Sequence, residues 1–167
     1  MNNRIFSFPP IIDESSEILI LGSIPGQKSL EKQEYYAHPQ NKFWRIIFEL
    51  FNEIFTTDYT KKIQILEKHH IALWDVIDTC ERKGSLDSEI RKEEANKIEE
   101  LLHNYPNIKA IFCNGQKSYK NLQKILSKDF HLPIIALPST SPAHASLRYE
   151  EKLLSWQKIK LRKIYFF

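Results

Sequence analysis

The stretch YYAHPQNKFW, residues 35–44, concentrates side chains that can stack on a ring or exchange hydrogen bonds. It contains Tyr35 and Tyr36, followed by His38 and Asn41. Exposed rings carry an unfavourable apolar hydration free energy, so adjacent tyrosines in a connecting segment are well explained if they line a pocket for a flat ligand. Asn41 and His38 have plainer interpretations. Asn41 would cap a helix predicted to begin at the next residue, and His38 would be a turn residue.

A second polar segment, PSTSPAHAS, covers residues 138–146. Small residues between two prolines form a compact, rigid tip, which can approach a phosphate backbone through N–H groups and hydroxyls. A generic polar loop would have a similar composition. The candidate phosphate-binding residues in and after this segment are Ser139, Thr140, Ser141, His144 and Arg148.

Two further segments supply acidic and glycine residues. Asp75 ends an apolar run, and a carboxylate in that position must be hydrogen-bonded or face a pocket. Asp87 is interpreted as capping or preceding a short helix. The GSIPG segment, residues 22–26, is equally typical of a plain strand-to-helix turn. It matches neither the dinucleotide-binding nor the P-loop glycine pattern, so nucleotide binding of those kinds is not indicated.

The elements that must position these residues alternate between strands and helices. Continuous apolar runs predict buried parallel strands at 18–21, 71–76, 108–113 and 133–137. Helical patterns cover 43–55, 61–68, 92–104, 118–126 and 147–164. This alternation predicts an α/β fold with a parallel sheet, in a single domain over residues 1–167. The polar segments all follow the carboxyl ends of predicted strands, where open α/β sheets bind ligands.

Composition limits the class of protein. The 167 residues carry a formal charge of +3, which permits a nucleic-acid partner without requiring one. Cys80 and Cys113 belong to no Cys/His cluster, so they are expected to be reduced thiols and not zinc or iron–sulfur ligands. We see no signal peptide and no apolar run of membrane-spanning length, about 20 residues. These features predict a soluble cytoplasmic protein with no membrane partner, nucleoid-associated if the source is a prokaryote.

Taken in order, five motifs resemble the uracil-DNA glycosylase superfamily, and within it the hypoxanthine-DNA glycosylase branch (family 6). They are GSIPG, YYAHPQNKFW, LWDVIDTCERKGSLDS, FCNG and LPSTSPAHAS, and the resemblance spans roughly residues 5–160. It implies a three-layer α/β/α sandwich with a four-stranded, mainly parallel sheet. It also implies a monofunctional DNA glycosylase that flips out a deaminated base, most specifically hypoxanthine, and hydrolyses its N-glycosidic bond. No metal and no cofactor are implied, and we expect a monomer acting on DNA that contains a deaminated base.

The resemblance also suggests roles for individual residues. Asn41 would hold the attacking water, because Ile24 stands where related branches carry a water-orienting asparagine or aspartate. Tyr36 would stack on the flipped base, and Ser23 would donate a hydrogen bond during catalysis. Leu137 replaces a histidine that assists uracil departure in the classical enzymes, which argues against strong uracil activity.

The remaining roles concern recognition. Gly22, with the main chain of the first turn, would contact the base, and Asp75 and Asn114 would read its edges. The loop residues Ser139, Thr140, Ser141 and His144, with Arg148, would contact DNA.

Three other functions remain open at the level of sequence. The first is a mismatch-type uracil-DNA glycosylase. The second is a lesion-binding module without catalysis. The third is a small-molecule enzyme of nucleoside or phosphate metabolism on the same fold.

Overall fold

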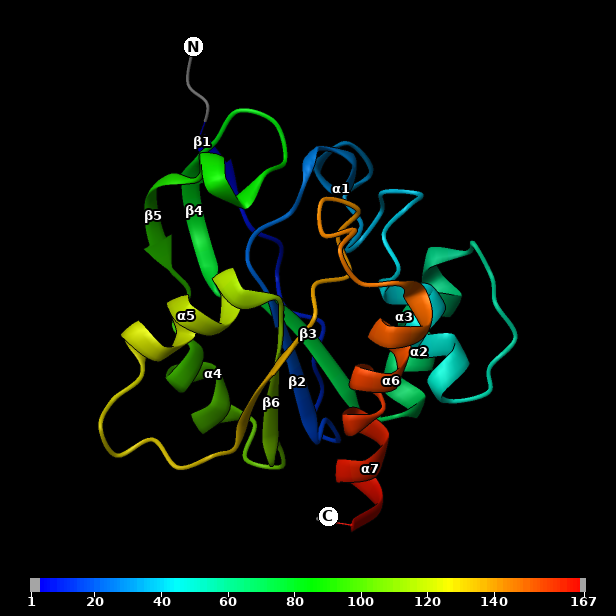
Figure 1. Cartoon of the computed structure of the whole chain (residues 1–167). Helices are drawn as coiled ribbons and strands as arrows, with labels where there is room; N and C mark the ends of the chain where they lie inside the picture. The colour runs from blue at the N-terminus through cyan, green and yellow to red at the C-terminus, as the bar shows by residue number, and fades with distance from the viewer. Residues whose placement is uncertain (1–3, 166–167) are drawn as a thin grey trace.

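A four-stranded parallel sheet forms the centre of the molecule (Figure 1). The computed structural model describes residues 4–165. The strands are β2 (Ile18–Gly22), β3 (Ile71–Asp75), β6 (Ala110–Asn114) and β7 (Ile134–Leu137), in the order β3-β2-β6-β7. Every residue of β2 is buried, as its continuous apolar sequence predicted. The register pairs Gly22 with Asp75 and Asn114 with Leu137, so the carboxyl ends of all four strands lie along one edge.

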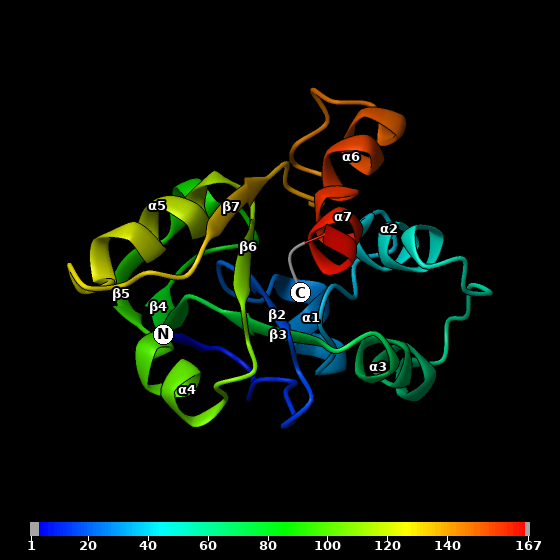
Figure 2. The same cartoon turned by 90° about the horizontal axis from the view of Figure 1, so that it is seen from below.

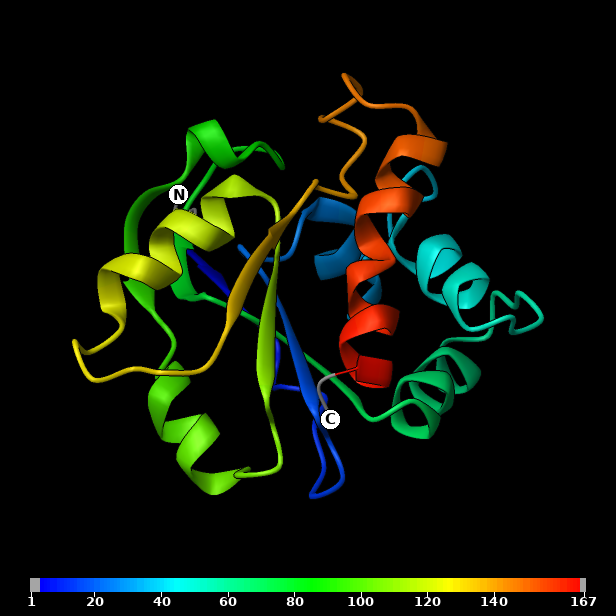
Figure 3. The same cartoon turned by 60° about the horizontal axis from the view of Figure 1, so that its bottom comes forward.

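Helices cover both faces of this sheet, which confirms the predicted three-layer α/β/α architecture. α4 (Ile98–Asn104) and α5 (Gln116–Ile125) lie on one face, and α2 (Phe43–Leu50), α3 (Tyr59–Lys68), α6 (Tyr149–Trp156) and α7 (Lys158–Tyr165) lie on the other (Figures 2 and 3). Each face has its own apolar cluster. Ile98 and Leu122 pack in the first, and Phe43 and Trp156 pack in the second.

A second, smaller sheet was not predicted from the sequence. It is antiparallel and consists of β1 (Arg4–Phe6), β4 (Ile77–Glu81) and β5 (Arg91–Ala95), in the order β1-β4-β5. The predicted strand at 71–76 ends at Asp75, and the chain enters β4 almost at once. Ile24, Ile77, Cys80 and Ile90 form the small core of this region.

The helix predicted over residues 92–104 is wrong in its first half. Residues 91–95, RKEEA, favour helix by composition but form β5, and all five are exposed. Pairing with β4 outweighs this propensity. Asn96 fixes the change of structure, because its N–H donates to the Val76 carbonyl (2.8 Å) and its Nδ2 to the Asp75 carbonyl (2.8 Å). The helix therefore starts only at Ile98.

Other predicted boundaries also moved. The helix predicted over 43–55 ends at Leu50, followed by Asn52 in the left-handed conformation (φ 54°), a common way to terminate a helix. The predicted helix 147–164 begins at Tyr149 and is divided at Gln157 into α6 and α7. No helix range was predicted for α1 (Gln27–Lys32). The short helix expected near Asp87 is the 3-10 helix η1 (Asp87–Glu89), in which Asp87 is the first residue.

Within residues 4–165, none of the helices has the length and apolar character that a membrane span needs. Cys80 and Cys113 are buried and not bridged.

Candidate active site

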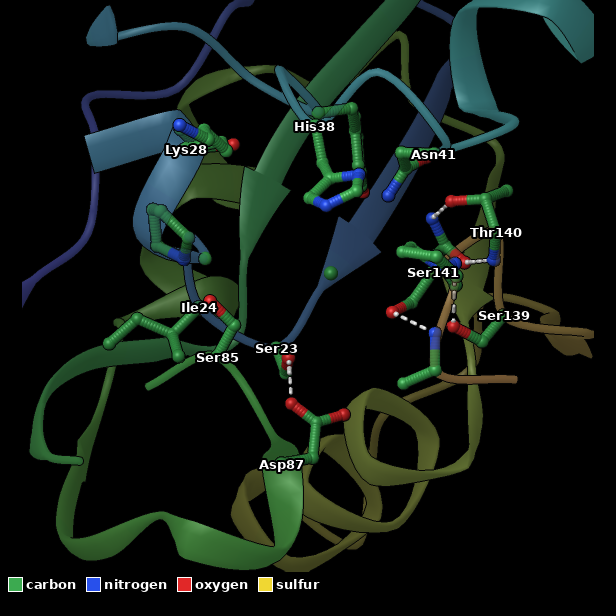
Figure 4. Close-up of a pocket in the computed structure, with 18 of the residues that line it drawn as sticks. Ser23, Ile24, Lys28, His38, Asn41, Ser85, Asp87, Ser139, Thr140 and Ser141 are labelled. Atoms are coloured by element: carbon green, nitrogen blue, oxygen red, sulfur yellow. Dashed lines mark hydrogen bonds between the residues drawn. The ribbon is translucent and has the colours of Figure 1, made fainter. Parts of the chain in front are cut away.

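A cavity of about 370 Å³ opens at the carboxyl edge of the parallel sheet (Figure 4). The polar segments identified in the sequence surround it. In the close-up, Ser23, Asp87, His38, Asn41 and Ser139 come from separate segments and border one hollow. The predicted site residues that line the cavity are Gly22, Ser23, Tyr36, Asn41, Asp75, Asn114, Ser139, Thr140, Ser141 and His144. Arg148 does not line it.

Asp75 and Tyr36 meet over Gly22, where β2 and β3 end. The Asp75 side chain is buried, with 4% of the residue exposed. Its Oδ2 and the Tyr36 hydroxyl are both buried without a hydrogen-bond partner. Burial, then the negative charge of Asp87, raises the pKa of Asp75 to about 7, and the positive charge of Arg82 offsets part of this effect. Near neutral pH the carboxyl is therefore populated in both its protonated and its ionised form.

Tyr36 presents an aromatic surface to the cavity from a fixed position. Its ring stacks on Phe43 with centroids 4.1 Å apart and an angle of 25° between planes. Its backbone adopts the left-handed conformation (φ 54°), which is uncommon for a residue with a side chain. Burial and then the Asp75 charge raise the pKa of the Tyr36 hydroxyl, so it stays protonated at neutral pH.

Tyr35 belongs mainly to the core. Only 4% of the residue is exposed, and its ring packs edge-on against Phe8 with centroids 5.2 Å apart. Its hydroxyl donates to the Pro9 carbonyl (2.9 Å), and its own carbonyl accepts from Trp44 Nε1 (2.8 Å). Part of Tyr35 still borders the cavity, but these bonds fix its position, and it supports Tyr36 from behind.

Asn41 is half-buried at the cavity wall. Its Oδ1 accepts a hydrogen bond from the Phe43 N–H (2.9 Å), so it satisfies a donor in the first turn of α2. The helix begins at Phe43 and its N-cap is Lys42, one residue later than predicted. Because an amide oxygen has two lone pairs, Oδ1 can still accept one more hydrogen bond.

Ser23 is already engaged in a hydrogen bond. Its Oγ donates to Asp87 Oδ1 (2.9 Å), which ties the first turn to η1 (Figure 4). Ile24 is 7% exposed and packs in the core of the small sheet. The apolar residue at this position thus holds the second sheet against the loop at the cavity.

Asn114 makes a two-fold contact with Thr140. Its Nδ2 donates to Thr140 Oγ1 (3.0 Å), and its Oδ1 accepts from the Thr140 N–H (3.0 Å). Thr140 is 1% exposed, and its carbonyl accepts from the Lys42 N–H (3.0 Å). These bonds join the ends of β6 and β7 to the segment around Asn41. The Asn114 amide also lies near the Tyr36 hydroxyl and lowers the pKa of that hydroxyl, against the larger effect of burial.

The segment 138–144 is a chain of small turns. Ser139 Oγ accepts from the Ser141 N–H (3.1 Å), and Ser141 Oγ accepts from the Ala143 N–H (3.2 Å). His144 is exposed at the rim. Arg148 lies beyond the cavity at the start of α6, where its backbone N–H donates to Glu151 Oε2 (2.8 Å).

Several contributors to the site gave no signal in the sequence. Arg82 is 5% exposed and donates through Nε to the Gly84 carbonyl (2.8 Å) and through Nη2 to the Pro25 carbonyl (2.5 Å). It therefore holds the two loops on one side of the cavity together. Lys28 and Leu86 border the same side, and Leu86 is 51% exposed. Because these contacts join loops that are distant in the sequence, no local sequence pattern predicts them.

The arrangement is suited to holding a flat, polar ligand. It combines an aromatic face, a carboxyl, an amide, hydroxyls and a rigid loop in one cavity. Among residues 4–165 we find no group of three or more His, Cys, Asp or Glu side chains placed to hold a metal ion.

Known proteins resemble this chain in sequence over most of its length. Residues 9–161 match the family model of the uracil DNA glycosylase superfamily. A hypoxanthine DNA glycosylase of Methanosarcina barkeri is 43% identical over 112 residues, which cover 66% of this chain and 71% of the relative. A hypoxanthine DNA glycosylase of Methanosarcina acetivorans is 38% identical over 138 residues, which cover 82% of this chain and 86% of the relative.

A solved structure shares the fold. It is a solution NMR structure of a candidate uracil DNA glycosylase from Methanosarcina acetivorans, with a TM-score of 0.79 and 34% sequence identity. The superposition covers 94% of this chain and 99% of the other.

Proposed function

The chain belongs to the uracil DNA glycosylase superfamily, and from that premise we propose that it excises hypoxanthine from DNA by hydrolysing the N-glycosidic bond. The two relatives named hypoxanthine DNA glycosylases support this choice of base. The observation that carries the proposal is the cavity itself, in which an aromatic face, a strand-end carboxyl and Asn41 surround a space of about 370 Å³.

A base inside a duplex cannot be reached by these residues, so the nucleotide must be extruded into the cavity. Tyr36 would stack on the extruded base, a contact worth about 1–3 kcal/mol. Its support on Phe43 keeps the ring in place before DNA arrives. Preorganisation of this kind reduces the ordering cost of binding.

Cleavage of the C–N bond develops positive charge on the sugar, as in other glycoside hydrolyses. Asn41 would hold the attacking water through the second lone pair of Oδ1. An amide is a poor base, so its contribution would be positioning, which can account for several kcal/mol of the barrier. The bond from Phe43 orients the amide for that task.

The departing base needs hydrogen bonds as it gains negative charge. Asp75 in its protonated form would donate one, and the N–H groups of the first turn near Gly22 are further donors. Ser23 would contribute after releasing Asp87, to which it donates in this structure. Asn114 would contact the edge of the base through its amide, while its contacts to Thr140 keep the DNA-facing loop in place.

The segment 138–144 would contact the DNA backbone through its hydroxyls and main-chain N–H groups, with His144 and Arg148 at its margin. We propose that residues 1–167 form one glycosylase domain, in line with the family match over residues 9–161. We propose that this domain acts as a monomer on DNA that contains a deaminated base. A DNA substrate would place the protein at the nucleoid in the cytoplasm of a prokaryote.

The test is an excision panel with oligonucleotides that contain hypoxanthine, uracil or xanthine, single-stranded and double-stranded. Released base is identified by mass spectrometry and abasic sites by alkaline cleavage. We expect free hypoxanthine and slower or absent release of uracil. Faster release of uracil would identify a mismatch-type uracil enzyme. Binding to lesion DNA without release of any base would identify a non-catalytic module, and absence of salt-dependent DNA binding would favour a small-molecule enzyme.

A further inference from the structure

A second cavity of about 270 Å³ lies directly beside the candidate active site. The two cavities share Ser141, Pro142 and His144, so residues 141–144 form the wall between them. The remaining lining residues of the second cavity are Gln40, Lys42, Ala145, Leu147, Tyr149 and Lys152. The position places whatever occupies it next to a nucleotide held in the first cavity.

Lys152 is the unusual member of this second cavity. The residue is only 5% exposed, and its Nζ donates to the His144 carbonyl (2.6 Å). No carboxylate pairs with it within the described part of the chain. An ammonium group has three donors, so two remain after the bond to His144. A buried cation without a counter-charge is costly and calls for an anion.

A second cation faces Lys152. Lys42 lines the same cavity, and burial followed by the positive charge of Lys42 lowers the pKa of Lys152. The two positive charges are thus held close together in the free protein. Among the described residues, no carboxylate forms an ion pair with Lys42. A bound anion would relieve both the repulsion and the missing hydrogen bonds.

The other charges around this cavity do not cancel these two. The Arg45 guanidinium lies 3.8 Å from the centre of the Tyr149 ring. Glu49 accepts a hydrogen bond from the Tyr149 hydroxyl and is not a lining residue of the cavity. Glu151 is engaged by the Arg148 backbone N–H. Among the described residues that line the cavity there is no carboxylate, so the formal charges of its wall are those of Lys42 and Lys152.

We propose that Lys42 and Lys152 bind one DNA phosphate in this second cavity, on the strand that carries the flipped nucleotide. The inference rests on the proposed DNA glycosylase function and adds to it a phosphate subsite. The wall of residues 141–144 would then separate the base from a phosphate of its own strand. This contact would hold the strand while the base is extruded.

A plainer role for Lys152 is to hold the loop through His144, and the experiment must separate the two. We would measure binding by fluorescence anisotropy to DNA with a tetrahydrofuran abasic analogue, which the enzyme cannot cleave, from 50 to 300 mM salt. The variants are Lys42→Gln, Lys152→Gln and the double variant. Lys124→Gln, an exposed change on α5 on the opposite face of the sheet, is the control.

For the double variant we expect affinity to fall roughly 5–10-fold, and the slope of log K against log salt to fall by about 0.9, the value for one phosphate. Single methylphosphonate linkages, which are neutral, then locate the contact. One linkage near the lesion should weaken the wild type and the control but leave the double variant unaffected. Lys42→Gln should lose part of the same response, which keeps the test valid if Lys152→Gln fails to fold.

The proposal is overturned if every methylphosphonate weakens the double variant as much as the wild type, or if the salt slope is unchanged. Failure of the proposed function looks different, because wild-type protein would then release no base in the excision panel. A loss of affinity at Lys152→Gln alone, insensitive to salt and to backbone charge, would assign Lys152 to the loop.

Discussion

The Oδ1 atom of Asp75 lies 2.5 Å from the point where a β-carbon on Gly22 would stand. The Tyr36 hydroxyl lies 3.0 Å from the same point. The parallel register brings the last residues of β2 and β3 side by side, so a carboxyl and a phenol converge on one α-carbon. This close approach requires glycine at position 22, for reasons of space and not of backbone conformation.

We therefore expect Gly22→Ala to displace Asp75 and Tyr36. Overpacking at such a site costs about 1–3 kcal/mol of stability, and the shift should slow base excision as well. Gly26→Ala is the matched change in the same turn, because its nearest contact would be Ser85 Oγ at an ordinary 3.4 Å. Thermal melts should give a clearly lower melting temperature for Gly22→Ala than for Gly26→Ala. Equal melting temperatures would show that Asp75 and Tyr36 can shift without loss of stability.

Asp75 should make stability depend on pH. Its pKa is about 7 in the folded protein and near 3.8 when unfolded, so the folded state holds the proton more tightly. The contribution of Asp75 to the free energy of unfolding is therefore fully present below about pH 4 and is lost as the pH rises through 7. Each unit of pKa difference corresponds to about 1.4 kcal/mol, which sets an upper limit of about 4 kcal/mol.

The measurement compares melting temperatures of wild type and Asp75→Asn from pH 4.5 to 8.5. We expect the variant to gain stability relative to wild type as pH rises, because it has no carboxyl to ionise. A constant difference over the range would mean that the Asp75 carboxyl titrates normally.

The sequence predicts a site residue when the role of that residue follows from its neighbours in the chain. Asp75 was identified because it ends an apolar strand, where a carboxylate must be hydrogen-bonded or face a pocket. Asn114 was identified through the FCNG motif of the family resemblance. Tyr36 was found because paired rings in a loop need an explanation. Asn41 lies beside the helix start that its residue type indicated, displaced by one position.

The residues that sequence reasoning missed act over long distances. Arg82 bonds to the carbonyl of Pro25, far away in the chain, and nothing near either residue indicates the partner. Residues 92–95 were predicted as helix because Ala95 continues the apolar stripe of the residues after it, yet they belong to β5, which pairs with β4 at a sheet edge. Apolar periodicity cannot reveal a strand whose residues are all exposed.

Thr140 should control the position of the DNA-facing loop. Thr140→Val keeps the shape of the side chain but removes the oxygen that accepts from Asn114 Nδ2. We expect weaker binding of lesion DNA and a stability loss of about 1–3 kcal/mol from the unsatisfied amide. The double change Ser139→Ala with Ser141→Ala should weaken DNA binding with a smaller effect on stability, since both side chains are only partly buried.

Binding titrations and thermal melts on the same preparations test this division. Thr57→Val, an exposed change in the loop before α3, serves as the control for the loss of a threonine hydroxyl. Unchanged DNA affinity in the serine variant would argue against a DNA-facing role for residues 139–141.

Tyr36 should act through its ring and not through its hydroxyl. Because the hydroxyl is buried without a partner, Tyr36→Phe should leave stability equal or slightly higher and excision close to normal. Tyr36→Ala removes the stacking surface, and a loss of about 1–3 kcal/mol predicts roughly 5–150-fold slower excision. Single-turnover rates at saturating enzyme measure this separately from DNA affinity. Equal damage from both variants would show that the hydroxyl is the functional group.

A structural and a catalytic role of Asn41 predict clearly different properties for the Asn41→Ala variant. Its bond to the Phe43 N–H makes it a helix-start residue, and losing such a bond costs about 0.5–2 kcal/mol. If that were its whole role, Asn41→Ala would melt earlier and excise normally per folded molecule. The catalytic role predicts that Asn41→Ala still binds lesion DNA but releases hypoxanthine at least ~100-fold more slowly, as expected for a lost positioning group.

Two further variants complete this test. Asp58 caps α3 by accepting from the Lys61 N–H (3.3 Å) and lies outside both cavities, so Asp58→Ala should lose comparable stability and keep its excision rate. Asn41→Asp can accept from Phe43 as the amide does, so it should restore the melting temperature. Its excision rate then reports on the water, because a carboxylate holds a water molecule but adds negative charge beside the DNA. Wild-type excision by Asn41→Ala would make Asn41 structural and move the search for the water-holding group to Ser23 and Asp75.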